Sequence, residues 1–157
     1  MIVIGYQGIG KSTIAGKQGC IDLESGNFWI DSSTRAPEWY RIYCNIAENL
    51  SDQGYTVFMS SHEVVRETLK SDIRYNKWSG KVVCIYPSLN LKSEWISKLL
   101  KRYNSTNMLK DFKAYSNARD MYEDNITDLA HSGFEKVELE DMNYNLKDIV
   151  DRLQVEH

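Results

Sequence analysis

A glycine-rich segment near the amino terminus constrains the fold of this chain more than any other feature. Residues 5–12 read G-Y-Q-G-I-G-K-S and directly follow an apolar run at residues 1–4. Glycines let the backbone curl so that successive N–H groups point inward at the start of a helix, where they can surround polyphosphate oxygens. The motif requires a strand before it and a helix after it. The segment therefore predicts a strand–loop–helix unit that binds a nucleoside triphosphate.

The residues of this loop have separate expected roles. Lys11 places a positive charge beside the β- and γ-phosphates of ATP, and Ser12 offers its hydroxyl to Mg²⁺. A glycine-rich turn without a ligand would fit the same letters, but the strand and helix around it favour phosphate binding. The residues expected to contact the nucleotide are Gly5, Gly8, Ile9, Gly10, Lys11, Ser12 and Thr13.

The composition is that of an ordinary globular chain. A length of 157 residues predicts a single domain over residues 1–157. The formal net charge of -3 gives no general attraction to nucleic acid. No apolar stretch approaches the ~20 residues that span a bilayer, and no basic leader precedes the first strand. Together with three scattered cysteines, these features predict a cytoplasmic protein without membrane or nucleic-acid partners.

Strands and helices are expected to alternate along the chain. Apolar runs rich in β-forming residues predict strands at residues 1–5, 20–23, 55–59, 81–86 and 134–139. Helical periodicity predicts helices at residues 11–17, 37–53, 64–69, 91–131 and 146–153, with a weak point at 104–107. Alternation of this kind predicts an α/β fold, in which a five-stranded parallel sheet forms the middle of a three-layer sandwich.

The chain resembles small P-loop NTPases of the nucleotide kinase type. The features that carry this resemblance are the loop at residues 5–12, a short second strand that ends in acids, and a long arginine-bearing helical region before the last strand. Adenylate kinase-like nucleoside monophosphate kinases are the nearest family, and gluconate and shikimate kinases are more distant. Residues 21–25 and 57–62 also resemble short phage-encoded nucleotide kinases. The resemblance implies the sheet order 2-3-1-4-5 and a reduced lid around residues 100–120.

The acids of this family are not all present. Many P-loop proteins carry an aspartate after the third strand, where this chain has Met59, Ser60 and Ser61. Asp22, at the end of the second strand, is therefore the expected replacement near the metal. Glu24 points the same way if the strand continues, so it is a candidate substrate ligand. Either carboxylate could orient a metal-bound water or accept a proton from a hydroxyl, and either could instead cap a turn.

Arginines outside the loop are candidates for stabilising the transferred phosphoryl group. Arg102 closes a predicted helix beside the weak point, where it could also be a solvated helix end. Arg119 falls within an apolar stripe and is therefore expected on the buried side of its helix, paired either with a phosphate or with a carboxylate such as Asp120. The stripe consists of Met108, Phe112, Tyr115, Tyr122, Ile126 and Leu129.

The acceptor is expected to lie near the second and third strands. Arg35 and Arg66 are the candidate clamp for an acceptor phosphate, although each could be an ordinary surface arginine. Phe28 and Trp29 could stack on a base. Trp39 fits the core stripe of its helix, and Ser60, His62 and Glu63 fit a capping box. The resemblance also implies that residues 141–144 lie over the ATP base.

These features predict an Mg²⁺-dependent transfer of the γ-phosphate of ATP to a nucleoside monophosphate. The attacking phosphate oxygen of such an acceptor is already anionic, so no strong base is needed. Two alternatives remain open: a kinase for the hydroxyl of a nucleoside or small polyol, which would need Asp22 or Glu24 as a base, and a nucleotide-binding module that acts as a switch without catalysis. The sequence does not indicate an oligomeric state.

Overall fold

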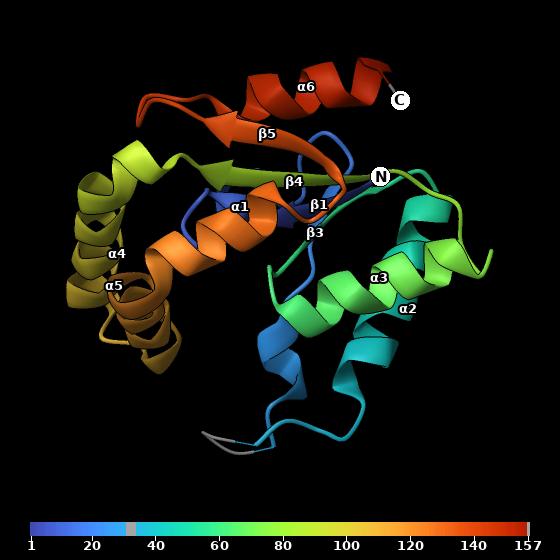
Figure 1. Cartoon of the computed structure of the whole chain (residues 1–157), viewed down its shortest axis with the longest axis horizontal. Helices are drawn as coiled ribbons and strands as arrows, with labels where there is room; N and C mark the ends of the chain where they lie inside the picture. Colours follow the sequence, from blue (N-terminus) through green and yellow to red (C-terminus); the bar gives the residue numbers. More distant parts are fainter. Residues whose placement is uncertain (31–33, 157) are drawn as a thin grey trace.

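The computed structural model describes residues 1–30 and 34–156 and contains a single parallel sheet. Its strand order is β2-β3-β1-β4-β5, which confirms the order that the resemblance implied (Figure 1). In sequence order, the strands are β1 (Ile2–Gly5), β2 (Cys20–Asp22), β3 (Thr56–Met59), β4 (Val82–Pro87) and β5 (Glu135–Leu139).

The centre of the sheet is apolar on both faces. Every residue of β1, β3 and β4 is buried, and Val3 of β1 lies between Phe58 of β3 and Val83 of β4. Strands covered on both faces read as continuous apolar runs, which is why the sequence predicts them well. The edge strand β5 is largely exposed and carries charged side chains.

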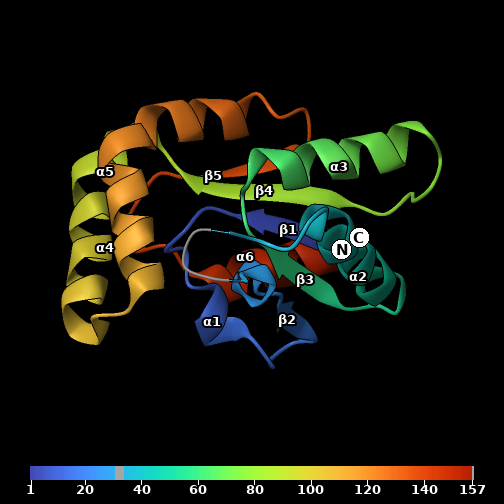
Figure 2. The same ribbon diagram turned by 90° about the horizontal axis from the view of Figure 1, so that it is seen from below.

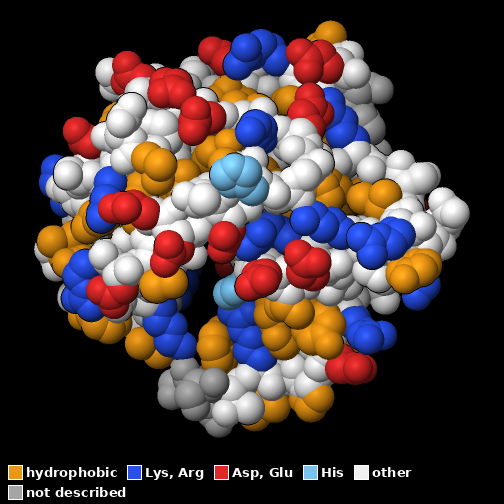
Figure 3. All heavy atoms as spheres, viewed as in Figure 1, with side chains coloured by type: hydrophobic (Ala, Val, Ile, Leu, Met, Phe, Trp, Pro, Cys, Tyr) orange, Lys and Arg blue, Asp and Glu red, His pale blue; other side chains and the backbone are white. Residues whose placement is uncertain are grey.

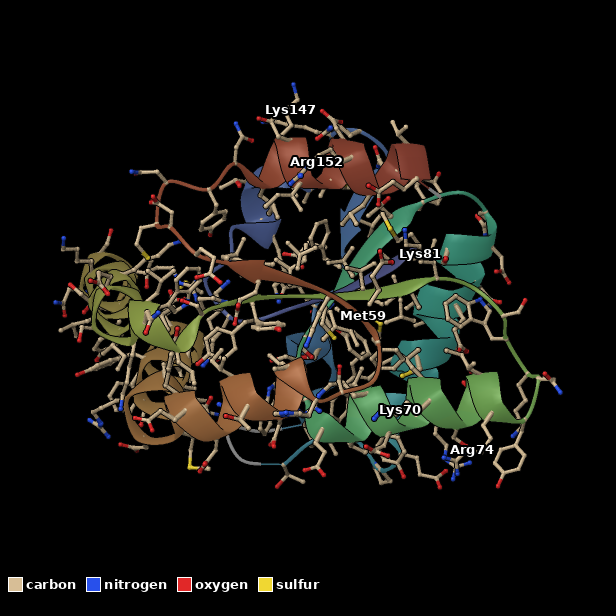
Figure 4. All side chains as sticks on the ribbon, turned by 45° about the horizontal axis from the view of Figure 1, so that its top comes forward. Met59, Lys70, Arg74, Lys81, Lys147 and Arg152 are labelled. Carbon is tan, nitrogen blue, oxygen red and sulfur yellow. The ribbon has the colours of Figure 1, made fainter. Side chains whose placement is uncertain are left out.

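Helices cover both faces of this sheet. Figures 1 and 2 show α2, α3 and α5 on one face, with α1 and α6 on the other. In Figure 4, Lys147 and Arg152 of α6 mark one outer surface, Lys70 and Arg74 of α3 mark the opposite one, and Met59 lies between them. The helices are α1 (Lys11–Ile14), α2 (Trp39–Asp52), α3 (Glu63–Arg74), α4 (Lys92–Thr106), α5 (Leu109–Ala130) and α6 (Leu146–Glu156). This arrangement is a three-layer α/β sandwich.

The long helical region before β5 is a hairpin of α4 and α5. The helices separate at Asn107, whose φ of 54° is left-handed, so the predicted weak point at residues 104–107 is confirmed. Close to this turn, Asp111 is buried, forms a salt bridge with Arg102 (Nε to Oδ1 3.0 Å) and accepts a hydrogen bond from the Thr106 hydroxyl. The hairpin lies beyond the carboxyl ends of the strands, where residues 5–12 also lie (Figure 1).

Some local predictions were wrong. The first helix ends at Ile14 instead of residue 17. The capping box does not form, because α3 starts after His62 without a side-chain cap. The backbone N–H of Ser60 instead donates to the Tyr43 hydroxyl (2.9 Å). Short 3₁₀ helices, η1 (Ser25–Phe28) and η2 (Leu89–Leu91), were not predicted. No helix in the described part of the chain is both long and apolar enough to cross a membrane.

Candidate functional site

The glycine loop, residues 5–12, connects β1 to α1 at the carboxyl edge of the sheet. Gly8 and Gly10 have φ angles of 91° and 102°, which L-residues rarely adopt. A β-carbon at Gly5 would clash with the side chain of Ile9. Each glycine of the motif therefore meets a backbone or packing requirement of this tight loop.

Several N–H groups of the glycine loop have no acceptor. Within residues 1–30 and 34–156, no hydrogen bond uses the backbone N–H of Gly8, Gly10, Lys11 or Ser12. The N–H of Ile9, in contrast, donates to Tyr6 O (3.3 Å). Unpaired N–H groups clustered in a loop form an anion-binding concavity.

Thr13 and Ile9 differ from the other predicted phosphate contacts. The N–H and the hydroxyl of Thr13 both donate to the Gly10 carbonyl, at 3.1 and 2.6 Å. The structure therefore brings the free donors together at Gly8, Gly10, Lys11 and Ser12, while the N–H groups of Thr13 and Ile9 serve to shape the loop.

Lys11 extends from the glycine loop toward two carboxyl groups. Loss of hydration lowers the pKa of its ammonium group, while Asp22 and Glu24 act in the opposite direction and Arg102 adds to the lowering. Lys11, Asp22, Glu24 and Arg102, which were all predicted to be functional, are thus within electrostatic range of one another.

Asp22 and Glu24 form an acid pair after β2. Burial raises the pKa of Asp22, Lys11 opposes this, and a hydrogen bond with the Glu24 carboxyl raises it further. Such a bond requires one carboxyl to keep its proton, so the pair can hold or release a proton beside Lys11. The pairing agrees with the prediction that both side chains point the same way.

The predicted metal ligands are oxygen atoms at two separate elements. Ser12 lies at the start of α1 and Asp22 at the end of β2. In the described residues, no group of three or more His, Cys, Asp and Glu side chains could hold a metal. A hydroxyl and a carboxylate suit Mg²⁺, which usually completes its shell with water and substrate phosphates.

Arg35 is held between aromatic rings on the other side of the cleft. Its guanidinium carbon lies 4.5 Å from the centre of the Trp29 ring and 4.1 Å from that of Trp39. Its Nη2 lies 3.2 Å from Nε2 of His62. Its Nη1 is buried and has no hydrogen-bond partner in the described part of the chain. A buried guanidinium N–H without an acceptor is costly and is suited to an anionic ligand.

His62 lies among positive charges. Burial, together with the charges of Arg35, Lys11 and Arg66, lowers its pKa to about 4. The imidazole is therefore neutral at pH 7 and can accept a hydrogen bond from Arg35. Arg66 is buried, and its Nε donates to Ser61 O (3.3 Å). The predicted clamp residues Arg35 and Arg66 thus lie around the same imidazole, together with Lys11.

The aromatic residues of the cleft have two different roles: some pack against one another, and one contacts charged side chains. The Phe28 ring packs against Trp39 and Tyr43, with centres 6.2 and 5.8 Å apart, so it supports the wall. The Tyr43 hydroxyl donates to Leu23 O (2.6 Å) and accepts from Ser60 N, which joins the ends of β2 and β3. Trp29 instead presents its ring to Arg35 and to Lys113 of α5.

The hairpin of α4 and α5 supplies the opposite wall. Lys113 Nζ lies 4.0 Å from the centre of the Trp29 ring, and Lys110 lowers the pKa of Asp22. Figure 3 shows a hollow between the α4–α5 side and the segment from η1 to α2, with Lys and Arg side chains along its walls. The glycine loop is also tied to α5, because Gln7 Nε2 donates to Ala114 O (3.1 Å) and Asn117 Oδ1 (3.0 Å).

The predicted burial of Arg119 was wrong. Its side chain is exposed and pairs with Asp120 (Nε to Oδ1 2.9 Å). The buried face of α5 contains Ala114 and Ala118 in place of Tyr115 and Arg119. The stripe was therefore assigned one position too late in the first half of the helix, which rotates Arg119 away from the sheet by about 100°. Arg119 does not join the other site residues.

Sequence reasoning missed some residues that the structure places in the cleft. Lys110 and Lys113 are spaced by a helical turn at the start of α5, a signal that could have revealed a basic face. Trp39 was assigned to the core, and its contact with Arg35 accompanies an antiparallel bridge between Trp29 and Arg35 that no periodicity indicates. His62 was assigned to a helix cap.

Comparisons with known proteins give one structural likeness to report. No protein-family model matches the chain, and no curated protein sequence matches it. The fold is similar to a solved structure of the tunicamycin resistance protein of Deinococcus radiodurans, with a TM-score of 0.60. The likeness covers 99% of this chain and 94% of that chain at 14% sequence identity, so it concerns the fold alone.

Proposed function

We propose that this protein is a P-loop phosphotransferase of the nucleoside monophosphate kinase type, which uses ATP and Mg²⁺. One observation carries this proposal: the unpaired N–H groups of Gly8, Gly10, Lys11 and Ser12 lie in one short loop at the carboxyl edge of the sheet, and Lys11 adds a positive charge to that loop. A triphosphate supplies the acceptors that these donors lack. The fold likeness is compatible with the proposal but does not identify a substrate.

In this proposal the glycine loop holds the phosphates of ATP. Lys11 neutralises charge on the β- and γ-phosphates, and Ser12 with Asp22 would hold Mg²⁺, which supplies further neutralisation of that charge. Arg102 is the lid arginine, because it is the α4 residue whose charge acts on Lys11. Arg119 has no part in the mechanism.

The acceptor is proposed to be a nucleoside monophosphate. The charges of Arg35 and Arg66 both act on neutral His62, and the buried Nη1 of Arg35 needs an acceptor atom. A phosphate dianion meets this need and balances the surrounding positive charge. The exposed part of the Trp29 ring offers a surface for a base.

A hydroxyl acceptor is the second candidate, and the Asp22–Glu24 pair favours it. A carboxylate that can take up a proton beside Lys11 could serve as the base that activates a hydroxyl.

Turnover with a panel of nucleosides, nucleoside monophosphates and small polyols tests the proposal. ADP release that depends on a nucleoside monophosphate supports it, and ADP release without any acceptor, or none, contradicts it. Lys11→Ala should lower turnover by roughly 100-fold or more, whereas Lys17→Ala, at an exposed lysine outside the loop, should not. Asp22→Asn separates the acceptors: weaker Mg²⁺ binding alone fits a phosphate acceptor, and lost turnover with normal ATP affinity fits a hydroxyl acceptor.

A further inference from the structure

Side chains from distant parts of the chain contact the outer side of the glycine loop. Trp95 of α4 donates from Nε1 to the carbonyl oxygen of Gln7 at 2.8 Å. Tyr144, between β5 and α6, donates from its hydroxyl to the carbonyl oxygen of Ile9 at 2.7 Å. Both acceptors belong to the loop, and both donors come from outside it.

The planarity of the peptide bond connects these contacts to the inner side of the loop. In a trans peptide unit the C=O and the following N–H point in opposite directions. The carbonyl of Gln7 shares its peptide unit with the N–H of Gly8, and the carbonyl of Ile9 shares its unit with the N–H of Gly10. Holding each carbonyl outward therefore turns each of these unpaired N–H groups inward.

The donors are themselves fixed by their surroundings. The rings of Trp95 and Tyr144 stack with centres 5.9 Å apart and an angle of 22° between their planes. Trp95 is fully buried, and a β-carbon on Gly8 would lie 3.1 Å from its Nε1. The loop therefore packs directly against the indole.

Lys98 orients the Tyr144 hydroxyl. Its Nζ donates to the Tyr144 oxygen at 3.0 Å and lies 4.5 Å from the centre of the Trp95 ring. Because an ammonium group can only donate, the single hydroxyl proton is left for Ile9. Burial raises the pKa of Tyr144 to about 12, so the hydroxyl keeps that proton at neutral pH.

We infer that Trp95 and Tyr144 are positioning residues of the triphosphate site, which aim the N–H groups of Gly8 and Gly10 at the ligand by holding the carbonyls behind them. This inference rests on the proposed function. It assigns a role to residues outside the glycine motif, which act on the phosphate-binding N–H groups through the carbonyls of the loop.

Tyr144→Phe tests the inference, because it removes the hydroxyl and keeps the ring. Tyr122→Phe is the matched control: Tyr122 is also buried, and its hydroxyl donates to the Ser88 carbonyl at 2.7 Å, on the β4–η2 connection. Calorimetric titration with ATP and with inorganic tripolyphosphate should show about three- to tenfold weaker binding for Tyr144→Phe, since one hydrogen bond is lost. Tyr122→Phe should bind both within about twofold of the unchanged protein while losing comparable stability in urea.

The outcomes separate this inference from the proposed function. Normal affinity in Tyr144→Phe, or an equal loss in Tyr122→Phe, overturns the positioning role while the triphosphate site stands. If the unchanged protein binds neither ATP nor tripolyphosphate, both ideas fail. Should Tyr144→Phe not fold, Trp95→Phe gives the same test at the Gln7 carbonyl, with the same expected loss.

Discussion

Single residues decide whether the glycine loop can keep its shape. Gly8 combines a left-handed φ with contact to Trp95 and Leu99, whereas Gly133 has a similar φ of 87° and open space within 4 Å of the point where a β-carbon would lie. Comparing substitutions at Gly8 and Gly133 therefore separates the cost of backbone strain, which both share, from the cost of steric clash, which only Gly8 has. Any effect seen only at Gly8 comes from the packing of the loop.

Gly8→Ala is expected to abolish tight triphosphate binding. Gly133→Ala should cost about 1 kcal/mol of folding free energy, the usual cost of a left-handed φ in an L-residue. Gly8→Ala should cost more, because a β-carbon would lie 2.9 Å from Leu99 Cδ2. Urea denaturation measures the folding free energies of both variants, and titration with tripolyphosphate measures their affinity for the anion. Unchanged affinity in Gly8→Ala would show that the loop conformation is not what binds the anion.

At the scale of elements, the α4–α5 hairpin is held by one buried carboxylate. The Asp111 side chain is 4% exposed and pairs with Arg102, whose side chain is 44% exposed. The Arg119–Asp120 pair has similar geometry, but both of its side chains are more than half exposed. Solvent screens exposed ion pairs, so the two pairs should differ in their contribution to stability.

Asp111→Asn is expected to lower the free energy of unfolding by about 1–3 kcal/mol, because it removes the charge that pairs with Arg102 and weakens the hydrogen bond from the Thr106 hydroxyl. Asp120→Asn should change it much less, because solvent screens this exposed pair. Urea denaturation of both variants checks the difference. Equal losses would mean that the carboxylate of Asp111 does not hold the hairpin.

The elements were more predictable than the side chains that line the cleft. The apolar runs of β1, β3 and β4 and the break at Asn107 can be read from periodicity, because burial on a regular element repeats at a fixed spacing. The Trp29–Arg35–Trp39 stack cannot, because it depends on the pairing of Trp29 with Arg35, which follows no fixed spacing. Arg119 failed for a related reason: aromatic residues mark a helix face less reliably when alanines such as Ala114 and Ala118 make the close contact with the sheet.

At the scale of the whole molecule, stability should depend on pH through a buried acid pair far from the glycine loop. Glu48 of α2 and Asp72 of α3 line a groove of about 530 Å³ between these helices. Burial, together with a hydrogen bond to the Asp72 carboxyl, raises the pKa of Glu48 to about 8. The folded protein therefore keeps a proton on Glu48 that the unfolded chain releases near pH 4.5.

Glu48→Gln should remove this dependence. Between about pH 4.5 and 8 the folded state binds more protons at Glu48, so this group lowers the free energy of unfolding as pH rises, by at most roughly 1.4 kcal/mol per pH unit. The stability of Glu48→Gln relative to the unchanged protein should thus increase across that window in urea denaturation. Asp72→Asn should weaken the trend. A difference independent of pH would show that Glu48 is ionised in the folded protein.

The Tyr43 hydroxyl has a consequence for how the cleft can open. This hydroxyl, which belongs to a residue of α2, bonds both Leu23 O and Ser60 N. It therefore joins the end of β2, which carries the acid pair, to the end of β3, which leads to His62. Gln7 ties the glycine loop to α5 instead. A widening of the cleft would therefore move the aromatic and arginine wall together with α2, while the lysine wall of α5 stays with the glycine loop.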